Sequence, residues 1–130
     1  MSPKKILLAE DDSDDSILFH EYLQDRTDIV LLPTVENGIE LFEYLYKTSK
    51  KHLPDLIILD QNMPKKNGIQ TLIELKADKA YSDIPVVVYS TYTDNQLIKA
   101  CTVKGARMVV SKPLTRKGYQ EMMDDFLSNL

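Results

Sequence analysis

The amino-acid sequence predicts a doubly wound α/β domain, in which helices cover both faces of a parallel sheet. Five short apolar runs alternate with five segments of helical periodicity along the 130 residues. Strands and helices that alternate in this way form right-handed βαβ units, and such units build a parallel sheet. Three of the apolar runs also lack polar alternation, as expected for strands that are buried on both faces.

The five predicted strands differ in their expected place within the sheet. Residues 6–9, 56–59 and 86–89 are uniformly apolar, so we expect them near its centre. Residues 29–32 and 108–110 are expected nearer to its edges.

The predicted helices lie between these strands. One begins near Asp14, and another begins behind Thr93-Asp94, which is typical of a helix cap. Two more follow Asn37-Gly38 and Asn67-Gly68, and Gly105 is expected at a helix C-terminus. The last helix carries the clearest amphipathic stripe, made of Tyr119, Met122, Met123, Phe126, Leu127 and Leu130.

Length, charge and cysteine content restrict the class of protein. The length fits one domain spanning residues 1–130. The net charge of −4 argues against direct binding to nucleic acid, which needs a basic surface. The apolar run of residues 6–9 is too short for a signal peptide or a membrane span. The single Cys101 fits a reducing compartment, so we expect a cytoplasmic protein with no membrane partner.

Chemically selective side chains follow the predicted strands. Glu10 and Asp11 come after the first strand, Asp60 after the third, Ser90 after the fourth and Lys112 after the fifth. In a doubly wound sheet, ligands bind beyond the carboxyl ends of the strands. Crowded carboxylates repel one another unless a cation lies among them, and oxygen ligands suit Mg²⁺. These five residues therefore predict a cation site at one end of the sheet.

The same residue types suit phosphoryl transfer. An aspartate beside a cation can attack phosphorus and form an acyl phosphate, while a hydroxyl and a lysine contact the phosphoryl oxygens. Each residue also has a simpler explanation: Glu10 and Asp11 as acids at a helix start, Ser90 as a loop hydroxyl, Lys112 as a surface lysine. Asp60 is the hardest to explain otherwise, because the strand before it should be central.

These residues stand in segments that resemble the receiver (CheY-like) domain of two-component response regulators. The matching segments are residues 6–12, 59–64 with Asn67-Gly68, 85–90 and 111–113. The resemblance covers nearly the whole chain. It implies a flavodoxin-like fold, with a five-stranded parallel sheet of order 2-1-3-4-5.

The resemblance also implies a role for each acidic residue. Asp60 would accept the phosphoryl group. Glu10 and Asp11 would be the family's acidic pair, with Asp11 as a direct ligand of Mg²⁺ or Mn²⁺. Asp60 would also bind this metal, and Asn62 would supply a backbone carbonyl. Asp12 comes next to this pair but matches none of the family's site positions, and it is expected to cap the first helix.

The remaining positions concern the switch between two conformations. By resemblance, Ser90 turns toward the phosphoryl group, Lys112 contacts it, and the Lys112–Pro113 bond is cis. The family often has an aromatic residue three positions before the lysine, where this chain has Val109. We therefore expect the switch to act through backbone shifts between Ser90 and Tyr92. Tyr92 itself is bulky enough to shield an acyl phosphate from water.

The implied function is a phospho-accepting response regulator. A sensor histidine kinase or a phosphotransfer protein would donate the phosphoryl group, and the only catalysis expected is phosphorylation and dephosphorylation of the chain itself. Since the chain ends just past its last helix, we expect it to act on a separate output protein. The expected contact surface is the face of the fourth helix, fifth strand and fifth helix, through which a homodimer can also form.

Three other functions fit the sequence less well. A metal-dependent phosphohydrolase of the aspartyl-phosphate type usually needs a second acid two residues after the nucleophile, where this chain has Asn62. A flavin-binding module needs a hydroxyl- and glycine-rich loop after the first strand, where this chain has carboxylates. A degenerate receiver would not keep all five site residues. His20 and His52 lack the context of a phosphodonor, and Cys101 is expected in the core.

Overall fold

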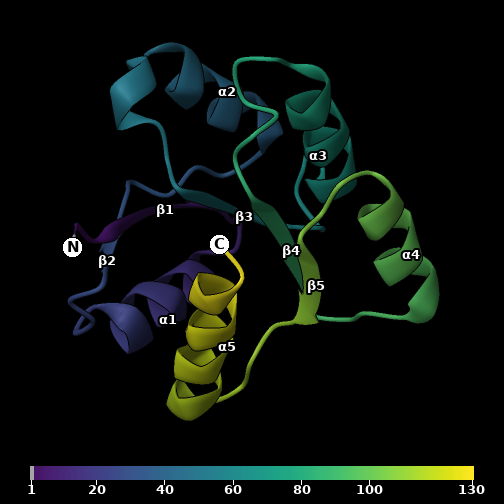
Figure 1. Cartoon of the computed structure of the whole chain (residues 1–130). Helices are drawn as coiled ribbons and strands as arrows, with labels where there is room; N and C mark the ends of the chain where they lie inside the picture. Colours follow the sequence, from purple (N-terminus) through teal and green to yellow (C-terminus); the bar gives the residue numbers. More distant parts are fainter. Residues whose placement is uncertain (1) are drawn as a thin grey trace.

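The computed structural model describes residues 2–130, and within them five strands alternate with five α-helices (Figure 1). One turn of 3₁₀ helix, Lys50–His52, was not predicted. The strands are β1 (Lys4–Ala9), β2 (Ile29–Leu31), β3 (Leu56–Asp60), β4 (Val86–Ser90) and β5 (Met108–Ser111). The helices are α1 (Ser13–Leu23), α2 (Gly38–Tyr46), α3 (Gly68–Ala77), α4 (Asn95–Val103) and α5 (Arg116–Ser128).

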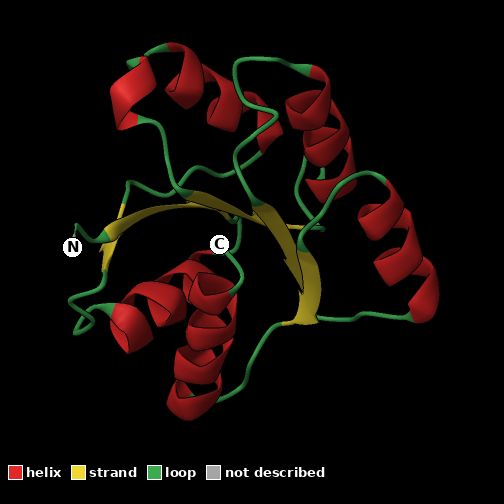
Figure 2. Cartoon of the chain, viewed as in Figure 1, coloured by secondary structure: helices red, strands yellow, loops and turns green. Residues whose placement is uncertain are grey.

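The strands form one parallel sheet of order β2-β1-β3-β4-β5 (Figure 2). This confirms the predicted flavodoxin-like fold, with β2 and β5 at the edges and β3 in the centre. Asp60 and Ser90 are the last residues of β3 and β4, whereas the sequence placed them just after the strands. Both side chains therefore lie at the carboxyl edge of the sheet.

Two helical layers cover the sheet, with α1 and α5 on one face and α2, α3 and α4 on the other (Figure 1). Successive side chains of a strand point to opposite faces, so each inner strand contributes to both cores. The core under α1 and α5 receives Ile6, Leu8, Leu56, Ile58, Val87 and Tyr89 from the sheet. The opposite core receives Leu7, Ala9, Ile57, Leu59, Val86 and Val88, and it also buries Cys101 as expected.

The helices begin at side chains that cap them. In each case the capping oxygen accepts a hydrogen bond from the backbone N–H three residues later, which satisfies a donor at the helix start. The caps of α1 to α5 are Asp12, Asn37, Asn67, Asp94 and Thr115. The predicted capping role of Asp12 is thereby confirmed. All five caps lie in the loops that leave the carboxyl edge of the sheet, on the side where the site forms.

The predicted cis bond between Lys112 and Pro113 is wrong, since every peptide bond within residues 2–130 is trans. The trans isomer is favoured by about 0.5–1 kcal/mol at such bonds, and the trans chain already brings Lys112 to the site. Its backbone N–H donates to the Ser90 carbonyl oxygen at 2.8 Å, while its ammonium reaches Glu10. As for membrane spans, the described part of the chain contains no helix of sufficient length and apolar character.

Candidate functional site

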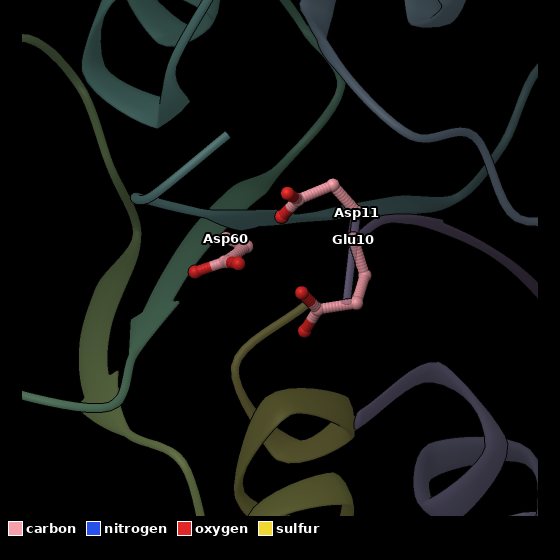
Figure 3. A group of neighbouring side chains, drawn as sticks. All are labelled: Glu10, Asp11 and Asp60. Carbon is pink, nitrogen blue, oxygen red and sulfur yellow. The ribbon is translucent and has the colours of Figure 1, made fainter. Parts of the chain in front are cut away.

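Three carboxylates meet at the carboxyl ends of β1 and β3. Glu10, Asp11 and Asp60 each offer an oxygen that lies within 4.8 Å of those of the other two. Figure 3 shows the three side chains directed into one space between these strand ends. Glu10 and Asp60 are only 2% and 3% exposed, whereas Asp11 is open to solvent. The structure therefore brings the predicted acidic cluster together.

Lys112 reaches this cluster from the end of β5. Its Nζ lies 2.8 Å from Glu10 Oε1, 2.8 Å from Asp15 Oδ2 and 3.3 Å from Asp60 Oδ2. Burial acts to lower the pKa of Lys112, but its hydrogen bonds to Asp15 and Glu10 and the charge of Asp60 outweigh burial and raise it. The ammonium is therefore a permanent positive charge among carboxylates.

The electrostatics of Asp60 differ from those of an ordinary aspartate. Burial, followed by the hydrogen bond to Glu10 and its negative charge, raises the pKa of Asp60 from 3.8 to about 7. Lys112 and the backbone N–H of Asn62 oppose this shift but do not cancel it. The negative charge on Asp60 is thus poorly compensated by the protein alone.

The loop after β3 is held close to Asp60. The Asn62 N–H donates to Asp60 Oδ1 at 3.2 Å, and the Gly68 N–H donates to the Gln61 carbonyl oxygen at 3.2 Å. A Cβ atom at Gly68 would lie 2.8 Å from the Asp60 carbonyl oxygen, so only glycine permits this approach. The loop therefore places the backbone of Asn62 beside the carboxylate of Asp60.

Ser90 and the residues after it form another side of the site. Ser90 is buried at the end of β4, and its carbonyl oxygen accepts the hydrogen bond from Lys112. Tyr92 is 73% exposed, in the loop that leads to α4. Val109 is half-buried and packs against the core under α2, α3 and α4.

Two residues of the site were missed by sequence reasoning. The Tyr89 hydroxyl donates to Glu10 Oε1 at 2.7 Å, and Asp15 pairs with Lys112. From the sequence, Tyr89 was predicted only as part of a uniformly apolar strand, and Asp15 was given no role. A hydroxyl next to the predicted switch residue was the one available signal for Tyr89. Asp15 carried no signal that set it apart from Asp14.

The donor set fits a divalent cation. Glu10, Asp11 and Asp60 supply carboxylate oxygens, which are the ligands that Mg²⁺ and Mn²⁺ accept. With Asp15 these acids bring four negative charges when ionised, and the Lys112 ammonium offsets one of them. A divalent cation would offset two of the three negative charges that remain.

Comparison with known proteins places this arrangement among signalling domains. Residues 6–124 match the model of the response regulator receiver domain. The chain is 39% identical to response regulator Rcp1 of Synechocystis sp. over 94 residues, or 68% of this chain and 63% of Rcp1. It is 30% identical to the C4-dicarboxylate response regulator DctR of Bacillus subtilis over 122 residues, or 94% of this chain and 51% of DctR. The chain thus spans between half and two thirds of these relatives.

Two solved structures share the fold closely. The Mn²⁺-bound form of Rcp1 superposes with a TM-score of 0.79 at 32% identity, covering 97% of this chain and 93% of Rcp1. The phosphorylated cyanobacterial phytochrome response regulator RcpA superposes with a TM-score of 0.84 at 32% identity, covering 98% of this chain and 96% of RcpA.

Proposed function

Since the chain belongs to the family of response regulator receiver domains, which accept a phosphoryl group in two-component signalling, we propose that Asp60 is the accepting residue. The observation that carries this proposal is its position. Asp60 ends the central strand, is nearly fully buried, and lies within reach of two further carboxylates and Lys112. Two proteins of the same fold support it, since Rcp1 has been solved with Mn²⁺ bound and RcpA in a phosphorylated form.

The chemistry follows from this arrangement. An Asp60 carboxylate oxygen attacks the phosphorus of a phosphohistidine; the new O–P bond forms as the P–N bond breaks, and the imidazole nitrogen leaves with its electron pair. Lys112 and Ser90 donate hydrogen bonds to the phosphoryl oxygens. Glu10, Asp11, Asp60 and the Asn62 carbonyl would hold Mg²⁺, which supplies positive charge against those oxygens when bound.

The partners and the location form part of the same proposal. A histidine kinase or a phosphotransfer protein donates the phosphoryl group, and the face of α4, β5 and α5 contacts an output protein or a second copy of the chain. Residues 1–130 act as one receiver domain in the cytoplasm, and they catalyse only their own phosphorylation and dephosphorylation. Cys101, buried and without a disulfide, is compatible with that compartment.

The direct test is the intact mass of the protein after incubation with a small phosphodonor. With Mg²⁺ and acetyl phosphate or phosphoramidate, the wild type is expected to gain one phosphoryl group, while Asp60→Asn gains none. Asp55→Asn, which changes an aspartate outside the site, is the matched control and should be phosphorylated like the wild type. No mass gain in the wild type, or an equal gain in Asp60→Asn, would refute the proposal.

A second prediction concerns Tyr92. If its exposed side chain shields the acyl phosphate from water, Tyr92→Ala should shorten the lifetime of the phosphorylated protein several-fold. The loss of the phosphoryl mass is followed over time after the donor is removed, with Tyr46→Ala, another exposed tyrosine, as the control. An unchanged lifetime in Tyr92→Ala would contradict a shielding role.

A further inference from the structure

Tyr89 is a buried tyrosine whose hydroxyl lies inside the acidic site. It precedes Ser90 in β4, and the strand register pairs it with Asp60. Because side chains alternate along a strand, Tyr89 faces the opposite side of the sheet from Ser90. That side is the one covered by α1 and α5. There its hydroxyl donates to Glu10 Oε1 at 2.7 Å.

Hydrogen bonds from three directions hold the Glu10 carboxylate. Oε1 accepts from the Tyr89 hydroxyl and from Lys112 Nζ, and Oε2 accepts from the Asp12 backbone N–H at 3.2 Å. An ionised carboxylate has about four lone-pair sites. Glu10 is therefore oriented by these donors and still has acceptor capacity for a ligand.

The two side-chain donors to Oε1 are not equivalent. Lys112 is charged, contacts Asp60 as well, and in the proposed reaction donates to the phosphoryl group. Tyr89 is neutral, so it orients Glu10 without repelling a cation. Its ring is fixed by an edge-on contact with Phe19 at a centroid distance of 6.4 Å and by Lys112 Nζ, 5.0 Å from the ring centroid.

We propose that Tyr89 is a positioning residue that holds the Glu10 carboxylate in the orientation needed to bind the divalent cation. This inference rests on the proposed function, because it concerns the same metal site. Hydrogen-bond partners of metal-binding carboxylates contribute to metal affinity, and their removal typically weakens binding by about 10–100-fold.

The test is a titration of the protein with Mn²⁺ alone, in which binding is measured by calorimetry or by electron paramagnetic resonance of the free ion. Tyr89→Phe removes one oxygen and keeps the ring, and it should bind Mn²⁺ about 10–100-fold more weakly than the wild type. Tyr119→Phe is the matched control. Tyr119 is equally buried and also contacts Phe19 edge-on, but among the hydrogen bonds of residues 2–130 none joins it to the acidic cluster. It should bind like the wild type.

Tyr89→Phe could also weaken binding through a general structural defect. To separate this from lost positioning, Tyr89→Phe is also made in a protein that carries Glu10→Gln. Positioning requires that Tyr89→Phe weaken Mn²⁺ binding much less there, because the carboxylate it orients is already gone. Saturating Mg²⁺ should also restore the phosphorylation rate of Tyr89→Phe. Wild-type affinity in Tyr89→Phe, or an equal loss in both backgrounds, would overturn the inference.

A second measurement uses only the wild-type protein, so it does not depend on whether a variant folds. With ring-¹³C-labelled tyrosines, the NMR signals of Tyr89 should shift more than those of Tyr119 when Mg²⁺ is added, and equal or absent shifts would count against positioning.

The experiments distinguish failure of the proposed function from failure of the role of Tyr89. If the wild type neither binds Mn²⁺ nor gains a phosphoryl group, the proposed function falls. If it does both and Tyr89→Phe binds like the wild type, only the role of Tyr89 falls.

Discussion

Lys112→Ala is expected to destabilise the folded protein by about 3–5 kcal/mol near neutral pH, because it leaves buried carboxylates without their counter-charge. The Lys112 side chain is only 8% exposed, and its ammonium contacts Glu10, which is fully buried, as well as Asp60 and Asp15. Glu10 and Asp60 are themselves buried, so water does little to offset their charges. The loss should shrink in acid, because Asp60, whose pKa is raised to about 7, becomes protonated.

The measurement is the free energy of unfolding from urea denaturation at neutral and at acidic pH. Lys117→Ala is the matched control: its side chain is 87% exposed, and its ion pair with Glu121 spans 3.8 Å. Exposed pairs of this kind contribute little, so Lys117→Ala should stay close to the wild type. A Lys112→Ala protein as stable as this control would show that the ammonium is not needed to offset the buried acids.

Asp60→Asn is expected to be more stable than the wild type at alkaline pH and no more stable in acid. The folded protein raises the pKa of Asp60 to about 7 from 3.8, so the folded state binds this proton more tightly than the unfolded state. Stability from this group is therefore fully present below about pH 4 and is lost as the pH rises through about 7. At about 1.36 kcal/mol per pKa unit, the loss is on the order of 4 kcal/mol, and asparagine avoids it.

This prediction is tested by urea denaturation across the pH range from about 4 to about 8, without divalent cations. Asp28→Asn provides a control of opposite sign, because its hydrogen bond to Arg26 lowers the pKa of Asp28. Its loss of stability should be constant across this pH range, because Asp28 stays ionised there, and it should fade only below the ordinary aspartate pKa of 3.8. Mg²⁺ should stabilise the wild type more than Asp60→Asn at alkaline pH, since the cation neutralises the Asp60 charge. A pH-independent difference between wild type and Asp60→Asn would contradict the raised pKa.

Much of the fold could be predicted because its signals are local. Uniformly apolar runs marked β1, β3 and β4 as inner strands, and the residues in front of α3 and α4 marked their starts. The predicted ends of β3 and β4 were one residue too early. Asp60 and Ser90 are polar, yet both still pair with the neighbouring strand. The 3₁₀ turn at Lys50–His52 was missed because so short an element leaves no periodic pattern.

The site divides in the same way. Glu10, Asp11, Asp60, Ser90 and Lys112 each follow or end a strand, and parallel strands bring their carboxyl ends to one edge, so the sequence by itself determined this set. Only the tertiary structure decided which of them touch. The bonds from Tyr89 to Glu10 and from Lys112 to Asp15 join residues 79 and 97 positions apart. They depend on strand register and on the packing of α1 against the sheet, which no local pattern encodes.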